Sequence, residues 1–338
     1  MHAVQRSRLV LIVAGLLVAG TSFAQPRRRT GNPEESLPAN ITMLSGFGER
    51  PAWSPDGKRI AFMHKSYGDA FEMDVASRVT RLLTGHFRHQ GFLRVHYLSN
   101  GDYLLIGARK FTDVSMTRRR DEEFWVMTAA HDKPPVALDQ RVSEGVAVSR
   151  KRNRIAWSNT HDQYPEQLRE DESMMYIADI EYRNGTPVLA NKAEVLRAPA
   201  PECTLEAQDF RNDDQELIYT CYRGRYADVM GVDLNTKKVT IYRKIADEYN
   251  EVEGISPDGQ WEVVESSKDQ QLGYIDLWKL NLEPNSTDFV RLTRWGDYEG
   301  YKATNPVISP DSKWMAFQSA QVSEAAGIGH GIFLLQMK

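Results

Sequence analysis

The sequence lacks the features that mark several large classes of protein. No segment shows a convincing helical period, and there is no Gly-x-Ser-x-Gly elbow of the kind that carries the nucleophile in many hydrolases. The glycines around His330 have no strand-to-helix context, so they do not indicate a phosphate-binding loop. Basic residues are not in excess either. The formal net charge of −4 argues against nucleic acid or an anionic membrane as the main partner.

The N-terminus resembles an export signal. Two arginines precede an apolar run, Leu9–Ala19, and Ser22–Ala24 forms a small-x-small cleavage site. The run is too short to span a bilayer comfortably. We therefore predict a signal peptide at residues 1–25, a polar leader at 26–39, and a periplasmic or secreted protein with no membrane span after cleavage. Cleavage changes the formal charge from −4 to −6, because the signal carries two arginines and no acidic residue.

A strand–turn–strand motif recurs along the rest of the chain. The three clear copies are Pro51–Phe62, Gly254–Gly259 and Asn305–Phe317. In each copy a proline favours the first central position of a type I turn, an aspartate bonds locally, and a glycine or serine follows. Such spacing is typical of a solenoid, a propeller or an array.

Weaker copies bring the number of units to six. The positions equivalent to Trp53 are Tyr97, Val148, Phe210, Ile255 and Ile308. Each unit has candidates for third and fourth strands, which predicts an all-β, six-bladed β-propeller of four-stranded antiparallel blades. The last unit ends after its third strand. We therefore expect residues 40–45 to pair with residues 332–337, closing a single domain over 40–338, and we expect a monomer.

The repeated Ser-Pro-Asp turn resembles the WD40-like PD40 repeat of the TolB-like β-propeller family. The resemblance covers residues 40–338 and implies the propeller fold, but it carries little information about activity. Oligogalacturonate lyases, which use histidines around manganese, have similar repeats. Their His-Pro-His-type cluster is not found here, and Asn305–Ile308 takes the comparable place.

Histidines are concentrated in loops that a propeller gathers on one face. These are the loops joining second to third strands and those joining one blade to the next, and their histidines are His64, His86, His89, His161 and His330. Imidazole is a common metal ligand and general base, so a divalent metal is a possible cofactor, although no cofactor is firmly indicated. The alternative interpretation is that these are ordinary loop histidines.

Two loops on the same face combine aromatic and charged residues. The residues singled out are Glu248, Tyr249, Tyr298, Glu299, Tyr301 and Lys302. Tyrosine rings next to carboxylates suit a sugar or a peptide, and paired carboxylates at a suitable distance suit acid–base hydrolysis. The alternative is a solvated rim. The two arginine triplets, Arg27–Arg29 and Arg118–Arg120, are interpreted as solvated charge.

The two cysteines flank the fourth motif. The turn near Asn212 lies midway between Cys203 and Cys221. Because the two segments on either side of this turn are equally long, we expect the cysteines to lie opposite each other on antiparallel strands. In an oxidising compartment this predicts a structural disulfide.

Two functional hypotheses follow. The first is an exported binding scaffold for a protein, peptide or glycan, which acts through the loop face and the central channel. The alternative is a metal-assisted polysaccharide lyase or hydrolase with a histidine-containing site at the channel mouth.

Overall fold

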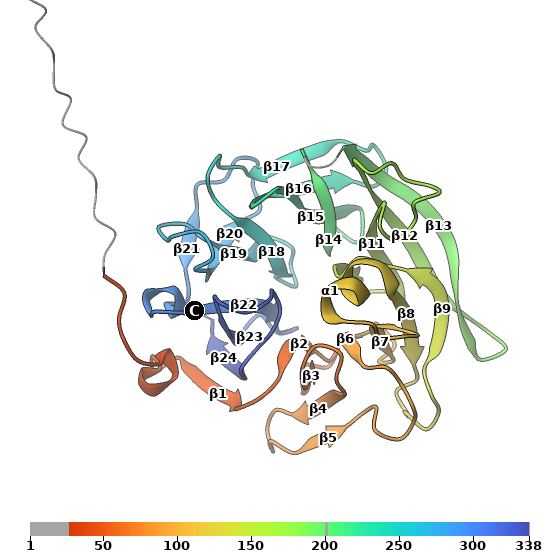
Figure 1. The fold of residues 1–338 in the computed structure, drawn as a ribbon, viewed down its shortest axis with the longest axis horizontal. Coiled ribbons are helices and arrows are strands. Elements are labelled where there is room, and N and C mark those ends of the chain that lie inside the picture. The colour runs from red at the N-terminus through yellow and green to blue at the C-terminus, as the bar shows by residue number, and fades with distance from the viewer. Residues whose placement is uncertain (1–26, 200–201, 338) are drawn as a thin grey trace, which may run out of the picture.

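The computed structural model describes residues 27–199 and 202–337, which form a closed ring of six four-stranded antiparallel sheets (Figure 1). The predicted six-bladed propeller is therefore confirmed. The predicted signal peptide lies outside the described residues. Within the described part of the chain, no helix has the length and apolar character that crossing a membrane requires.

The first three blades follow one another in the chain. Blade one contains β2 (Glu49–Trp53), β3 (Arg59–Met63), β4 (Ala70–Asp74) and β5 (Thr80–Leu82). Blade two contains β6 (Phe92–Tyr97), β7 (Tyr103–Ala108), β8 (Glu122–Met127) and β9 (Val136–Arg141). Blade three contains β10 (Val146–Val148), β11 (Arg154–Thr160), β12 (Glu172–Arg183) and β13 (Thr186–Pro199).

The remaining blades complete the ring. Blade four contains β14 (Thr204–Arg211), β15 (Glu216–Arg223), β16 (Tyr226–Asp233) and β17 (Val239–Arg243). Blade five contains β18 (Asn250–Ile255), β19 (Trp261–Ser266), β20 (Asp276–Asn281) and β21 (Phe289–Arg291). Blade six contains β22 (Tyr301–Ile308), β23 (Trp314–Gln321), β24 (Ile332–Gln336) and β1 (Ile41–Ser45). Short helical turns are η1 (Pro33–Ser36), α1 (Val114–Met116), η2 (Thr117–Asp121) and η3 (Trp295–Asp297).

The repeated turn forms as its residues predict. Ser54 Oγ donates to Asp56 Oδ1 at 2.6 Å and accepts from the backbone N–H of Arg59 at 2.9 Å. Gly57 follows with a φ of 68°, in the left-handed region that glycine tolerates best. The same pair of bonds recurs at Ser256 and Ser309.

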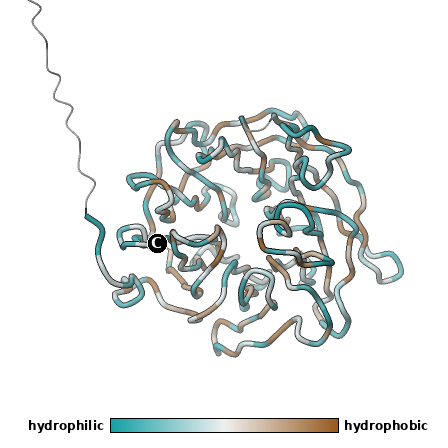
Figure 2. Tube along the Cα trace, viewed as in Figure 1, coloured by the Kyte–Doolittle hydropathy of each residue, from teal (hydrophilic) through white to brown (hydrophobic). Residues whose placement is uncertain are grey.

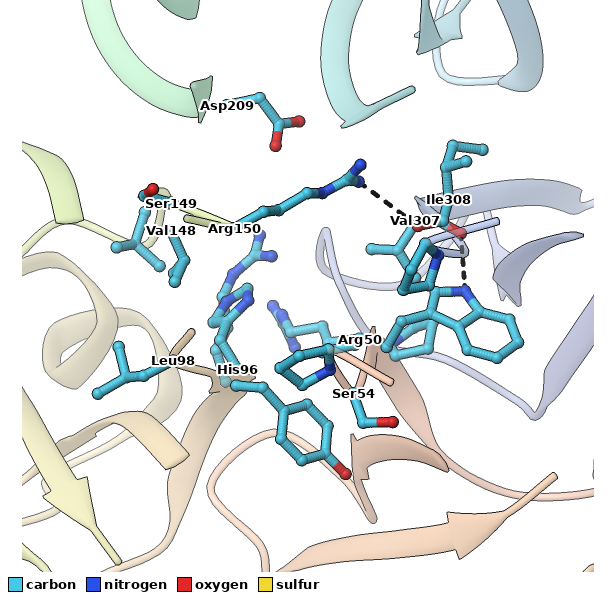
Figure 3. Close-up of a pocket in the computed structure, with 18 of the residues that line it drawn as sticks. Arg50, Ser54, His96, Leu98, Val148, Ser149, Arg150, Asp209, Val307 and Ile308 are labelled. Atoms are coloured by element: carbon cyan, nitrogen blue, oxygen red, sulfur yellow. Dashed lines mark hydrogen bonds between the residues drawn. The ribbon is translucent and has the colours of Figure 1, made fainter. Parts of the chain in front are cut away.

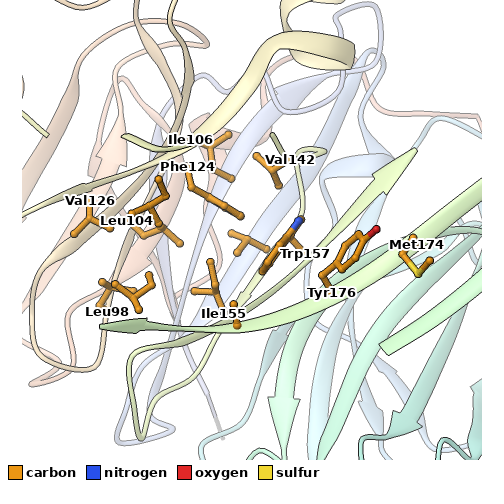
Figure 4. Close-up of a cluster of buried hydrophobic side chains, with 14 of the residues drawn as sticks. Leu98, Leu104, Ile106, Phe124, Val126, Val142, Ile155, Trp157, Met174 and Tyr176 are labelled. Atoms are coloured by element: carbon orange, nitrogen blue, oxygen red, sulfur yellow. The ribbon is translucent and has the colours of Figure 1, made fainter. Parts of the chain in front are cut away.

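The hydrophobic core lies between neighbouring blades. Between blades two and three, Trp157 packs edge-on against Phe124 with ring centroids 5.6 Å apart and stacks on Tyr176 at 5.7 Å (Figure 4). The sheets are therefore buried on both faces, which explains why the strands are hydrophobic along most of their length. The projecting tip of the long β12–β13 hairpin is hydrophilic (Figure 2).

The ring is closed by its two ends. Strand β1 pairs antiparallel with β24, and Met43 lies opposite Phe333. This confirms the predicted closure and covers a sheet edge that would otherwise be open.

The predicted disulfide is present, with a different register from the one expected. Cys203 and Cys221 are bonded, and their Cα atoms are 5.0 Å apart. The residue directly opposite Cys221 is Leu205, so the link runs diagonally between the strands. Because Arg211 pairs with Glu216, the turn is centred beyond the midpoint of the two cysteines.

The leader and the first arginine triplet are not simply solvated. The guanidinium carbon of Arg28 lies 3.4 Å from the centroid of the Tyr274 ring, and Arg29 pairs with Tyr298 in an isolated parallel bridge. The side chain of Arg28 therefore stacks on a tyrosine face, which the interpretation as solvated charge did not predict, whereas Arg27 and Arg29 are exposed, in agreement with that interpretation.

Candidate functional site: a charged central channel

The innermost strand of each blade lines a channel along the axis of the ring. On the loop side it holds a cavity of about 280 Å³, and on the turn side one of about 190 Å³. The two cavities share Arg94, Glu253 and Asn305 as lining residues. We call them the loop-side and the turn-side cavity.

Bulges in the innermost strands put polar residues into this channel. The register shifts between Glu49 and Ala52 in β2, between Val252 and Gly254 in β18, and again at Asn305 in β22. Arg50 and Asn305 take left-handed φ values of 51° and 49°. Each bulge adds one or two unpaired residues and re-aims their side chains, which turns Arg50, Glu253 and Asn305 toward the channel.

Arginines and one glutamate close the mouth of the loop-side cavity. Glu144 lies 2.7 Å from an Nη atom of Arg50 and 3.3 Å from one of Arg94, and it also pairs with Arg118. Arg118 Nη1 donates to the carbonyl of Ala326 at 2.7 Å, which ties two loops together. Arg118 belongs to the second arginine triplet, which is therefore not uniformly solvated. Helix α1, in the same loop, lies close to the centre of the ring (Figure 1).

Three carboxylates gather in the wall of the loop-side cavity. Glu251 and Glu253 come from β18 and Glu265 from β19, and one oxygen from each lies within 4.8 Å of the others. We call this group the carboxylate triad. It is the sole group of three metal-ligating side chains found among residues 27–199 and 202–337, and it contains no histidine.

Burial and mutual repulsion make the triad electrostatically costly. Loss of water raises the pKa of Glu251, Glu253 and Glu265 to about 8 each, and each carboxylate adds to the effect on another. The hydroxyls of Tyr222 and Tyr249 both donate to Glu251.

The turn-side cavity is less acidic and holds a buried imidazole. Burial and the neighbouring Arg94 lower the pKa of His96 to about 3, so the ring is neutral under physiological conditions. Arg150 reaches across this cavity and donates to the carbonyl of Ile308 at 3.5 Å (Figure 3). It also donates to the carbonyl of Ile255 at 2.8 Å. Asp209 lies on the same wall, and burial raises its pKa to about 6.

The structure brings two of the sequence-predicted site residues into the channel. Tyr249 and Lys302 line the loop-side cavity. The others lie outside this cavity: His64, His86, His89, His161, Glu248, Tyr298, Glu299, Tyr301 and His330. Several of them have local partners. His89 contacts Asp69 at 3.0 Å, His330 contacts Glu324 at 2.6 Å, and Glu248 pairs with Arg243. The histidine-based site remains a prediction.

Sequence reasoning missed the carboxylate triad and the arginines around it. A signal was present, since Pro51 and Pro306 interrupt the innermost strands just before the repeated turn. Proline within a strand marks an edge or a bulge, and the residue before each of these prolines lines the channel.

These features define a six-bladed β-propeller with a buried, charged channel. No family model matches the chain, and no curated protein matches it. Solved structures that it resembles include a gluconolactonase from Xanthomonas campestris, with 10% identity, a TM-score of 0.57, and coverage of 94% of this chain and 96% of that one. An oligogalacturonate lyase in complex with manganese matches with 13% identity and a TM-score of 0.51, over 86% and 78% of the two chains.

TolB from Acinetobacter baumannii is also among the structural neighbours. It has 12% identity and a TM-score of 0.36, and the match covers 88% of this chain and 54% of that protein. At such identities the likeness shows the β-propeller fold alone.

Proposed function

We propose that this protein is an exported binding protein that receives a peptide segment of a partner protein on its loop face. The observation that carries the proposal is an exposed, largely aromatic surface beside the mouth of the channel. We call it the aromatic rim, and it consists of Phe47, His64, Tyr67, Phe111 and Val114.

The rim draws its residues from three loops of blades one and two. The rings of Phe47 and His64 are 5.7 Å apart, and those of Tyr67 and Phe111 are 5.1 Å apart. Phe47 is 41% exposed and Phe111 36%. Exposed aromatic side chains are enriched at the centres of protein interfaces, where they supply much of the binding energy.

The rim adjoins the charged channel directly. The Tyr67 hydroxyl donates to Glu122 at 2.6 Å, and Ser66, in the same loop, donates to Glu49 at 2.8 Å. Glu49 in turn pairs with Arg50 in the channel. A ligand anchored on the rim therefore has a polar cavity within reach for one of its own polar groups.

Ring geometry favours a peptide over a saccharide. Saccharides stack on open ring faces, whereas Phe47 has T-shaped neighbours in Phe62, His64 and Phe71. The resulting irregular apolar surface suits the side chains of a peptide.

Selection from a displayed library of random peptides tests the proposal. Peptides chosen by the mature protein should bind at least about tenfold more weakly to a Phe47→Ser, Phe111→Ser variant. The matched control is Val79→Ser, Val290→Ser, which removes two exposed apolar side chains from outer strands or their turns (66% and 52% exposed) and should bind like the parent. Equal binding to both variants, or ligands found only on a saccharide array, would contradict the proposal.

Export is tested separately. A C-terminally tagged full-length chain, expressed in a Gram-negative host, should be recovered from the periplasm or the medium with residues 1–25 removed. Recovery of the uncleaved chain in the cytoplasm would contradict export without bearing on the binding surface.

A further inference from the structure

The carboxylate triad has two further oxygen donors beside it. Thr304 and Asn305, on β22 of the next blade, line the same cavity and are only 4% and 6% exposed. Thr304 Oγ1 and Asn305 Oδ1 have no hydrogen-bond partner among the described residues. A buried polar atom without a partner is costly, and both oxygens have lone pairs free to bind a ligand in the cavity.

Backbone and side-chain bonds fix this arrangement. The backbone N–H of Asn305 donates to Glu265 Oε1 at 2.6 Å, and Asn305 Nδ2 donates to Glu253 Oε1 at 3.2 Å. Glu265 also lies directly opposite Glu251 in the β18–β19 ladder. Two blades thus hold the five side chains against one cavity, with little freedom to move apart.

The positively charged side chains nearby do not neutralise the negative charge of the carboxylate triad. Arg94 approaches Glu253 only to 4.0 Å, and it is shared with Glu144, which it approaches more closely. Lys302 is the other cationic side chain that lines the cavity near Glu251 and Glu265. Three carboxylates packed together therefore favour an additional positive charge.

We propose that the carboxylate triad, together with Thr304 and Asn305, forms a binding site for a divalent cation of the calcium type. Calcium prefers six to eight oxygen ligands at about 2.3–2.6 Å, drawn from carboxylates, amide carbonyls and water. One oxygen from each triad member lies within 4.8 Å of the others, so a single ion can contact all three carboxylates.

The tyrosines around the triad fit the role of outer-sphere support. Tyr222 and Tyr249 both donate to Glu251, which orients its carboxylate and leaves further lone pairs for an ion. Ligating carboxylates are commonly held by such outer hydrogen bonds. The site goes beyond the proposed peptide-binding function, because it requires no ligand on the rim.

Calorimetric titration of the chelator-stripped mature protein with calcium chloride, in the absence of any peptide, tests the site. We expect one calcium ion per chain and a higher melting temperature in calcium. Glu253→Gln and Glu265→Gln should each weaken binding at least about tenfold. The matched control is Glu262→Gln, which changes an equally buried glutamate on the same strand as Glu265 but outside the triad. This control should bind calcium like the parent.

Thr304→Val provides a second variant that leaves the packing volume nearly unchanged. It removes an oxygen that has no partner within the described residues, so the variant should fold normally, as judged by circular dichroism, and bind calcium more weakly. Absence of binding up to about 1 mM calcium, the weak end of the range for extracellular sites, would overturn the proposal. Unchanged binding in Glu253→Gln, Glu265→Gln and Thr304→Val would overturn it equally. Tighter binding of magnesium than of calcium would overturn the calcium assignment.

Discussion

The guanidinium of Arg50 lies 2.7 Å from the carboxylate of Glu144, although the two residues belong to blades that are not neighbours. Arg50 is in the innermost strand of blade one, and Glu144 lies in the loop that leads into blade three. The pair therefore spans blade two at the mouth of the channel, and Glu144 also contacts Arg94 and Arg118.

Removing the Glu144 charge should destabilise the fold. In Glu144→Gln the buried Arg50 loses one of its two carboxylate partners, with an expected cost of about 3 kcal/mol in the free energy of unfolding. Urea unfolding measures this cost. The control is Glu194→Gln, which breaks an exposed pair with Arg197 and should cost less than about 1 kcal/mol. Equal effects of the two substitutions would argue against a buried junction.

The third clear turn offers a stabilising substitution. Ser312 has a φ of 60°, where the matching residue of the first copy is Gly57 with a φ of 68°. Ser312→Gly should raise the free energy of unfolding by up to about 1 kcal/mol, because glycine takes this conformation without strain. The reciprocal change, Gly57→Ser, should lower stability by a similar amount. Thermal and urea unfolding of both variants check the sign.

Asp209 should make stability depend on pH. Burial raises its pKa from 3.8 to about 6, so the folded protein holds this proton more tightly than the unfolded chain does. The stabilisation of the folded state by this bound proton is fully present below about pH 4 and is lost as the pH rises through about 6. Asp209→Asn removes this pH-dependent loss of stability and should stabilise the protein by about 3 kcal/mol at pH 7, with little gain at pH 4.

Asp258 provides the opposite case for the same experiment. The hydrogen bond that Asp258 accepts from Ser256 lowers the pKa of the Asp258 carboxyl. The ionised carboxylate therefore stabilises the fold at neutral pH, and this stabilisation is lost as the pH falls through the lowered folded-state pKa. Asp258→Asn should therefore be less stable than the parent at pH 7 and approach it in acid. Parallel pH profiles for the two aspartate variants would contradict both assignments.

Reduction of the disulfide should destabilise the fourth blade. The bond between Cys203 and Cys221 closes a segment with a sequence separation of 18 residues, which corresponds to about 3 kcal/mol. Unfolding with and without dithiothreitol measures the effect in the parent. The Cys203→Ser, Cys221→Ser variant should start from the lower stability and show no further response to the reductant.

Local chemistry explains how much of this fold could be predicted from the sequence. The turn at Ser54 is built from hydrogen bonds within five residues, so the repeat could be recognised from local sequence. Counting the repeats and their strands then predicted the number of blades and the closure by β1. Most of the residues that line the channel could not be inferred, because bulges break the alternation by which inward-facing residues are recognised. Arg50 and Glu253 are aimed by bulges, and Arg118 gains its partner only when distant loops meet.

The chemistry of a histidine could not be inferred from the sequence for a similar reason, and the histidine-based site stays a prediction. That chemistry depends on what the fold places beside the ring, and His89 and His330 each have a carboxylate neighbour of their own. Glu251 lies in the same segment as Glu248 and Tyr249, to which the sequence points, whereas Glu253 and Glu265 were not singled out, because single acidic residues within strands resemble ordinary surface positions.

Pairing of Ile41 with Leu335 has a consequence for how the molecule is made. Five sheets are built from consecutive segments and are free to assemble in the order of synthesis, but the sixth needs both extremities at once. During synthesis strand β1 has no native partner until β24 has been made, so this sheet can be completed only after the segments that form the other five sheets are present.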